Sequence, residues 1–367
     1  MTATLVASHA ATSPDDLLAR SAPAAVAISG ADQSAWNGEI VRTTDGVLGL
    51  AHWDGTLYLG DGILDPLRQM YERAGQTQPA TDLISYREAL ATLLHEHAHF
   101  LGPAGASQEA ARGAFIQPGS RQLEEGIAEA WAQDHLDEFL IRLGVDEVAP
   151  GIHDVESTGY YPAFVPAIRI LTTDLETRAG LAQGEVLNTL NRQTAEGQFP
   201  LLVGLLYNST RLPDLDTHTQ ATTTRNRLEH LLREGLSHLD TYELHPPGHA
   251  GARSRSTTAL LLTHLQSELT SAESAHHPHP TACALPAPTP IPTSSTAPAP
   301  TPTPASAAAA GNPSAVPSRL IPGGISTQHA FYTALAGLPP PTLTRTTTPT
   351  SASPPPRPTP TSQALSR

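Results

Sequence analysis

The composition of the chain changes sharply near residue 275, and this break limits which part of the chain can fold. The last acidic residue is Glu273, and 22 of the 35 prolines follow it, mixed with threonine, serine and alanine. A segment with so few large apolar side chains cannot offset the conformational entropy that is lost on folding. We therefore expect a disordered tail over 275–367, one folded domain over 25–270, and a flexible N-terminus over 1–24.

Two features of the tail bear on partners and chemistry. Residues 321–338 form an apolar island, which is either a segment that docks on a partner or a stray apolar stretch. The single cysteine, Cys283, also lies in the tail. One thiol can form neither an internal disulfide nor a zinc-thiolate cluster, so a metal site in this chain would depend on histidine and carboxylate ligands.

Charge and hydropathy exclude several kinds of partner. The part before residue 275 carries all 35 acidic residues and 17 of the 21 basic ones, giving a formal charge of −18. Nucleic acid is not expected, because a phosphate backbone requires a basic surface. No apolar run approaches the ~20 residues of a membrane span, and no signal peptide is visible. We expect no membrane association and a cytoplasmic location by default, with export by a signal-independent route left open. All basic residues are arginine, which is typical of a GC-rich bacterial genome.

Residues 38–60 have the pattern of a small sheet. Apolar runs are separated by Asp45-Gly46 and Asp54-Gly55. Asp-Gly pairs between such runs favour tight hairpin turns, since both turn positions take positive φ. The segment therefore predicts an antiparallel β-meander.

Helical periodicity dominates the rest of the domain. It predicts long helices over 82–101, with Thr81 as N-cap, and over 121–143, ended by Gly144. A mostly helical subdomain is expected over 155–270. The predicted fold class is α+β: an antiparallel β-meander packed on two long helices, followed by a helical C-terminal half.

The first of these helices carries the sequence His95-Glu96-His97-Ala98-His99, which fits the pattern H-E-x-x-H. Residues four apart lie one turn apart on the same helical face, so His95 and His99 can bind one metal ion. Glu96 lies about 100° around the helix, where it can take a proton from an attacking water without competing as a ligand. His97 points nearly the opposite way and is interpreted as a surface or packing residue. The alternative without a metal site is a solvated, histidine-rich helix.

A catalytic zinc site needs a third protein ligand and one open position. The extended metzincin pattern fails, because Gly105 stands where a third histidine is required and no methionine follows Met70. The second long helix instead carries Glu124-Glu125-Gly126-Ile127-Ala128-Glu129. This segment resembles the glutamate helix of the gluzincin clan of zinc metallopeptidases, over about 50 residues from the first histidine onward.

The resemblance implies a set of roles. Glu125 would be the third zinc ligand, and Glu129, one turn further, would accept a hydrogen bond from a ligand imidazole. Glu124 is the alternative ligand. The non-functional interpretation of Glu124, Glu125 and Glu129 is that they are acidic residues favoured near the start of a helix by its dipole. Asp134 and His135 lie too far along the helix to share a site with Glu125, and either would be a ligand only if the helix docked differently.

The same resemblance implies a donor from a later segment that stabilises the oxyanion. The candidates are His153, Tyr160, Tyr161 and Arg169, and Tyr161 is favoured. Buried tyrosines that only pack a helix start are the competing interpretation.

Together these features predict a zinc-dependent hydrolase that acts on a peptide or protein substrate. Zn²⁺ would lower the pKa of its water to about 7, and Glu96 would act as the base. The alternative is a non-catalytic, zinc-stabilised interaction or regulatory module. The intact Glu96 favours the enzyme, since a purely structural metal needs no base.

Overall fold

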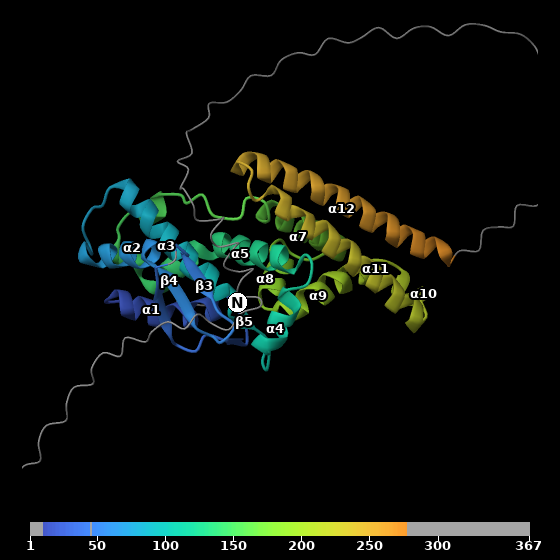
Figure 1. Ribbon diagram of the computed structural model, residues 1–367, viewed down its shortest axis with the longest axis horizontal. Coiled ribbons are helices and arrows are strands. Elements are labelled where there is room, and N and C mark those ends of the chain that lie inside the picture. Colours follow the sequence, from blue (N-terminus) through green and yellow to red (C-terminus); the bar gives the residue numbers. More distant parts are fainter. Residues whose placement is uncertain (1–9, 45, 277–367) are drawn as a thin grey trace, which may run out of the picture.

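The computed structural model describes residues 10–44 and 46–276 (Figure 1). The expected tail from 277 onward, its island at 321–338, and residues 1–9 lie outside the described residues. The described part is a mixed α+β protein that is mostly helical, as predicted. None of the helices in it combines the length and the apolar character that crossing a membrane would require.

Five short strands occur in the described part. They are β1 (Gln33–Ser34), β2 (Ile40–Thr43), β3 (Gly49–Ala51), β4 (Leu57–Gly60) and β5 (Leu101–Gly102). Helices account for most of the remainder. They are α1 (Pro14–Ser29), α2 (Asp61–Glu72), α3 (Ala80–His99), α4 (Gln108–Phe115), α5 (Ser120–Leu143), α6 (Val145–Val148), η1 (Ile152–Asp154), α7 (Val165–Ala179), α8 (Glu185–Asn191), α9 (Ala195–Asn208), α10 (Leu212–Leu215), α11 (His218–Ser237), η2 (His238–Tyr242) and α12 (Pro247–Ala275).

The sheet formed by residues 40–60 is not the predicted antiparallel meander. Its strand order is β2-β4-β3, and β2 pairs with β4 in parallel while β3 pairs with β4 antiparallel. A hairpin does form at Asp54-Gly55, with the His52 N–H donating to the Thr56 carbonyl, but only Gly55 has positive φ (+88°), so the turn is not the predicted one in which both residues take positive φ. The segment after β2 instead carries the chain across to the far side of β4. β4 takes the central position because its side chains at Leu57 and Leu59 are fully buried.

The prediction of a flexible N-terminus over 1–24 is wrong from residue 14 onward. Helix α1 begins there because Ser13 caps it, accepting a hydrogen bond from the Asp16 N–H (3.1 Å). Pro14 occupies the first helical position, where its fixed φ favours a helix start. Leu17 and Ala25 are then fully buried, and the helix packs against α3 and α5.

The two long helices that carry the motifs are confirmed. α3 and α5 match the predicted ranges 82–101 and 121–143 within two residues, and they pack against each other. α3 begins after Pro79 at its N-cap, so Thr81 lies inside the first turn and not at the cap. Gly144 ends α5 with φ +67°, as predicted.

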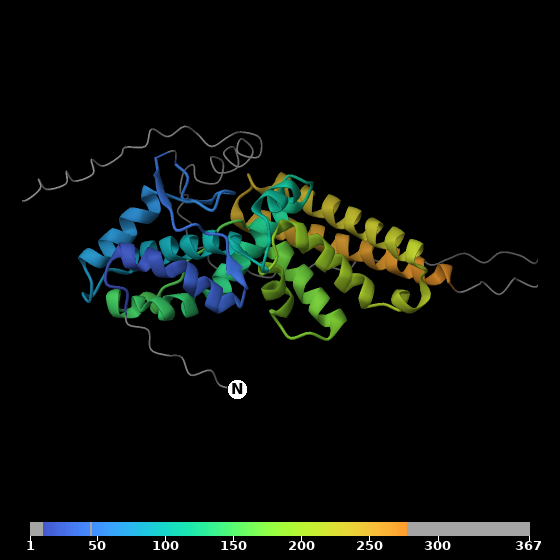
Figure 2. The same ribbon diagram turned by 90° about the horizontal axis from the view of Figure 1, so that it is seen from below.

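The helical C-terminal half extends further than the periodicity suggested. α12 is the longest described helix, with 29 residues, and packs against α7 and α11. Its sequence is rich in Ala, Ser and Thr, so one narrow stripe of buried residues, Leu261, Leu265 and Leu269 among them, holds it to the core. Figure 2 shows an elongated molecule, with α1–α3 at one end, α5 in the middle and α9–α12 at the other end.

Candidate metal centre

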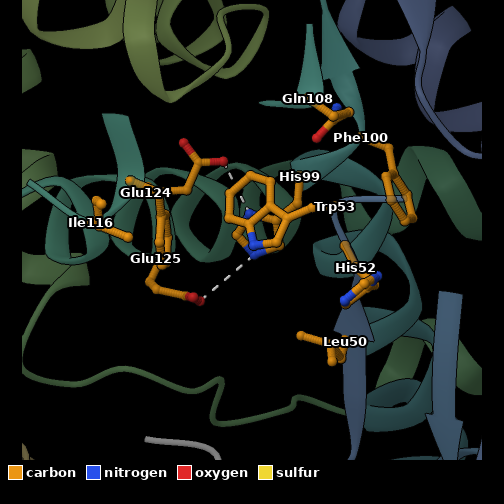
Figure 3. Close-up of a pocket in the computed structure, with 11 residues that line it drawn as sticks. Leu50, His52, Trp53, His99, Phe100, Gln108, Ile116, Glu124 and Glu125 are labelled. Atoms are coloured by element: carbon orange, nitrogen blue, oxygen red, sulfur yellow. Dashed lines mark hydrogen bonds and ion pairs between the residues drawn. The ribbon is translucent and has the colours of Figure 1, made fainter. Parts of the chain in front are cut away.

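Helices α3 and α5 bring three potential ligand atoms together. His95 Nε2 and His99 Nε2 lie 3.1 Å apart, and the Glu125 Oε2 atom lies 3.3 Å from the first and 3.6 Å from the second. Figure 3 shows Glu125 directed at His99. Tetrahedral zinc with ligands at about 2.05 Å separates ligand atoms by about 3.3 Å. The three side chains therefore form a group with the spacing that a metal ion requires.

The other nitrogen of each histidine ring faces a carboxylate. His95 Nδ1 lies 3.0 Å from Glu129 Oε2, and His99 Nδ1 lies 3.1 Å from Glu124 Oε1. An ionised carboxylate only accepts hydrogen bonds, so Nδ1 must be the protonated nitrogen in both rings. In the neutral rings the lone pair is then on Nε2, the atom that faces the centre of the group.

Each of these carboxylates is held by a further donor. Glu129 Oε1 accepts from the Tyr160 N–H and from Gln133 Nε2, both at 2.8 Å. Glu124 Oε2 accepts from Gln198 Nε2 on α9. Glu129 thus contacts the Nδ1 atom of His95, and Glu124 contacts the Nδ1 atom of His99, so neither faces the Nε2 atoms that converge with Glu125.

The electrostatics of the cluster call for a cation. Burial alone would lower the pKa of His95, but the contacts with Glu125 and Glu129 outweigh it and raise the pKa to about 9. Burial likewise opposes the charge of His99, yet Glu125 and Glu124 raise its pKa well above the usual value. The same imidazoles hold the pKa of the Glu125 carboxyl well below its usual range despite burial. Several buried carboxylates lie close together here and need positive charge beside them. Protons on the imidazoles or a bound metal ion can supply that charge.

Glu125 has unused binding capacity. Its side chain is 1% exposed, and neither carboxylate oxygen accepts a hydrogen bond from any described residue. Both imidazoles lie within ion-pair distance of it, at 3.3 and 3.6 Å. A buried carboxylate that accepts no hydrogen bond is unfavourable unless a cation lies beside it, so this observation fits a metal ligand.

Glu96 lies beside the cluster and is kept out of it by the sheet. Its Oε2 atom accepts a hydrogen bond from the Ala51 N–H of β3 (2.8 Å), and the side chain is almost completely buried. The absence of a side chain at Gly49 makes room for the carboxylate, since a Cβ there would lie 2.6 Å from Glu96 Cγ. Burial raises the pKa of the Glu96 carboxyl, although the neighbouring imidazoles oppose this.

Tyr161 reaches the cluster from the loop before α7. Its ring stacks on His95, with centroids 5.6 Å apart and planes 14° apart. It is the one non-glycine residue with positive φ (54°) in the described chain. Strained backbone of this kind persists only where surrounding contacts hold it, and the hydrogen bond from Tyr160 N to Glu129 is such a contact.

The remaining candidates lie elsewhere. His97 is buried and not on the surface: its Nε2 atom lies 2.6 Å from Ser21 Oγ, and Trp36 packs edge-on against its ring. Arg169, one of the candidate oxyanion donors, forms an ion pair with Asp134, the residue that was set aside as a metal ligand. His153 and His135 have other partners, Asp137 and Asn188 respectively.

The sequence did not reveal several residues that lie near the group formed by His95, His99 and Glu125. His52 and Trp53 follow β3 and line the same pocket as His99, and Gln198 reaches Glu124 from α9. The position of His52 and Trp53 at the end of a predicted strand, directly before Asp54-Gly55, was the available signal. Gln198 gave none, because its role depends on how α9 packs.

Comparison of the chain with protein-family models, with curated proteins and with solved structures finds no match. The resemblance to gluzincins therefore stands on the residues of this chain alone. What the structure supports directly is a His95, His99 and Glu125 group that could hold a metal ion.

Proposed function

We propose that this protein is a zinc-dependent hydrolase, and specifically a peptidase of gluzincin type. The observation that carries the proposal is the convergence of two histidine Nε2 atoms with the carboxylate of Glu125, which accepts no hydrogen bond from the described residues, next to a buried glutamate held outside this group. A structural zinc site is closed by four protein ligands, whereas a catalytic one has three and an open position. The three ligands found here favour the catalytic kind.

Zinc is the metal that this ligand set suits best. Imidazole and carboxylate ligands at tetrahedral spacing are typical of hydrolytic zinc sites, while calcium and magnesium prefer six or more oxygen ligands. Bound zinc would supply Lewis acidity and the acidified water that hydrolysis at neutral pH requires.

The protein residues have separate tasks in this mechanism. Glu129 and Glu124 fix the tautomers of His95 and His99 through their Nδ1 atoms. Glu96 accepts the proton of the attacking water and passes it to the leaving amine. Tyr161, stacked on His95, supplies the donor to the developing oxyanion.

The sheet offers a place for an extended peptide. β3 lies at the edge of the β2-β4-β3 sheet, and its outward-facing Ala51 N–H already contacts Glu96. A substrate strand that pairs with this edge would lie beside the base and the metal.

The test has two stages. Metal content is first measured by mass spectrometry on untagged wild type, His99→Ala and Glu125→Ala, and about one zinc per chain, lost in both variants, is expected. Peptide hydrolysis by wild type and by Glu96→Gln is then compared. The Glu96→Gln protein should keep its zinc and lose at least about 100-fold in rate. Zinc binding with a rate indifferent to Glu96 would favour the non-catalytic module, and no zinc even after reconstitution would refute both proposals.

A further inference from the structure

A pocket opens directly beside the metal cluster and is mainly apolar. His99 and Glu125 form one side of it (Figure 3). The rest of its wall is largely made of the side chains Leu50, Trp53, Phe100, Phe115 and Ile116. The charged residues that line it within the described chain are Glu124 and Glu125, and both face the imidazoles.

One wall of the pocket comes from the connection between the two metal helices. Helix α4 lies in this connection and ends at Phe115, with Ile116 directly after it. Ala111 is the one buried side chain in α4, so the helix is lightly anchored. The Ile116 side chain is 56% exposed at the pocket, which leaves apolar surface available to a ligand.

The pocket is narrow in this structure. Trp53, at the turn after β3, packs edge-on against Phe115 with ring centroids 5.3 Å apart. The remaining cavity volume is about 30 Å³, space for one or two water molecules. A dry cavity that accepts a benzene-sized group measures about 150 Å³, so a large apolar side chain enters only if the walls of the pocket, which include the Trp53–Phe115 pair, move apart.

We propose that this pocket binds a large, uncharged apolar side chain of the substrate next to the bond that is hydrolysed, and that Trp53 and Phe115 separate to admit it. The inference rests on the proposed hydrolase function for its biological meaning. Its physical basis is independent, because apolar walls favour an apolar side chain whether or not the bond is then cleaved. A charged side chain would lose its hydration there, because Glu124 is already bound to His99 and Gln198, and Glu125 would be committed to the metal ion in the zinc-loaded protein.

Binding of small blocked amino acids tests the pocket without any need for catalysis. The full-length, zinc-loaded protein is titrated with N-acetyl-leucinamide, N-acetyl-phenylalaninamide and N-acetylglycinamide while tryptophan emission is recorded. The two apolar amides should bind at least about 10-fold more tightly than the glycine amide. The emission change should disappear in Trp53→Phe, since neither of the other two tryptophans lines the pocket: Trp36 packs against His97, and Trp131 is fully buried. Equal binding of all three amides, no binding, or an unchanged signal in Trp53→Phe would overturn the inference.

Two exposed isoleucines provide a matched pair of variants. Ile116→Asp places a charge at the pocket, and Ile141→Asp places one on a similarly exposed residue (50%) of α5 that does not line it. Ile116→Asp should weaken binding of the leucine amide about 5-fold or more, and Ile141→Asp should leave it unchanged. Equal effects of the two variants would refute the pocket assignment.

Cleavage of a mixed peptide library then tests the link to function. Products should carry large apolar residues on one side of the cleaved bond, and this preference should weaken in Ile116→Asp. Cleavage without such a preference would refute the pocket inference alone. A protein that binds the apolar amides but cleaves no peptide would refute the proposed hydrolase function and retain the binding pocket.

Discussion

Glu129→Gln is the substitution that most directly tests how the cluster is organised. Glu129 faces three donors, His95 Nδ1, the Tyr160 N–H and Gln133 Nε2, at 3.0, 2.8 and 2.8 Å. A glutamine has nearly the same shape but only one acceptor oxygen. If that oxygen faces Tyr160 and Gln133, its NH₂ group faces His95 and favours the tautomer with the proton on Nε2. The proton then occupies the atom that would bind the metal.

The opposite orientation of the new amide is also unfavourable. The oxygen then serves His95, but the NH₂ group faces the Tyr160 N–H, which is left without an acceptor. Loss of such a carboxylate partner typically lowers metal affinity 10- to 100-fold, which corresponds to about 1.4–2.8 kcal/mol. We therefore expect the zinc dissociation constant of Glu129→Gln to rise within that range.

The assay is a competition titration against a chromophoric zinc chelator at fixed pH. Asp134→Asn is a suitable control, because Asp134 lies on the same helix and pairs with Arg169. Thermal unfolding of the metal-free proteins separates a loss of affinity from a loss of fold. An affinity for Glu129→Gln within twofold of wild type, with the fold intact, would show that Glu129 does not control the His95 tautomer.

Three further predictions follow from the same geometry. Gly49→Ala places a Cβ 2.6 Å from Glu96 Cγ, so the rate of peptide hydrolysis should fall at least about 10-fold while the zinc content is retained. Loss of zinc instead would contradict the assignment of Glu96 as the base. Gly159→Ala should lower the free energy of unfolding, measured by denaturant titration, by about 2–4 kcal/mol, because Gly159 has φ +68° and an added Cβ would clash with neighbouring side chains. Gly180→Ala is the control: Gly180 has a similar φ (+65°) but open space around it, so the loss should be only about 1 kcal/mol. Zinc binding at pH 7 should release protons, because the raised pKa of His95, about 9, leaves the free imidazole protonated; affinity should fall as the pH falls, and a calorimetric heat independent of the buffer would contradict this.

The sequence identified the part of the site that depends on local helix geometry. His95 and His99 are four residues apart on one helix, so their shared face follows from the helical repeat whatever surrounds it. Their contact at 3.1 Å agrees with that prediction. The helix ranges were also predictable, because apolar periodicity and Gly144 mark them directly.

Predictions that required pairing between distant segments were less accurate. The alternation of apolar residues did not determine the strand order β2-β4-β3, because an antiparallel meander and the observed sheet bury the same side chains. Helix α1 was missed although Ser13 and Pro14 carry a start signal, whereas α12 lies almost wholly within the predicted helical subdomain, and only its bounds were not identified because its buried stripe is narrow.

The sequence by itself determined which residue types are available for metal chemistry and which of them share a helical face. Only the tertiary structure decided that Glu125 joins His95 and His99, that Glu124 instead binds the Nδ1 atom of His99, and that β3 holds Glu96 aside. The reason is physical: neighbours on one helix are fixed by its repeat, whereas the meeting of α3, α5 and β3 depends on how the buried faces of the whole domain pack together.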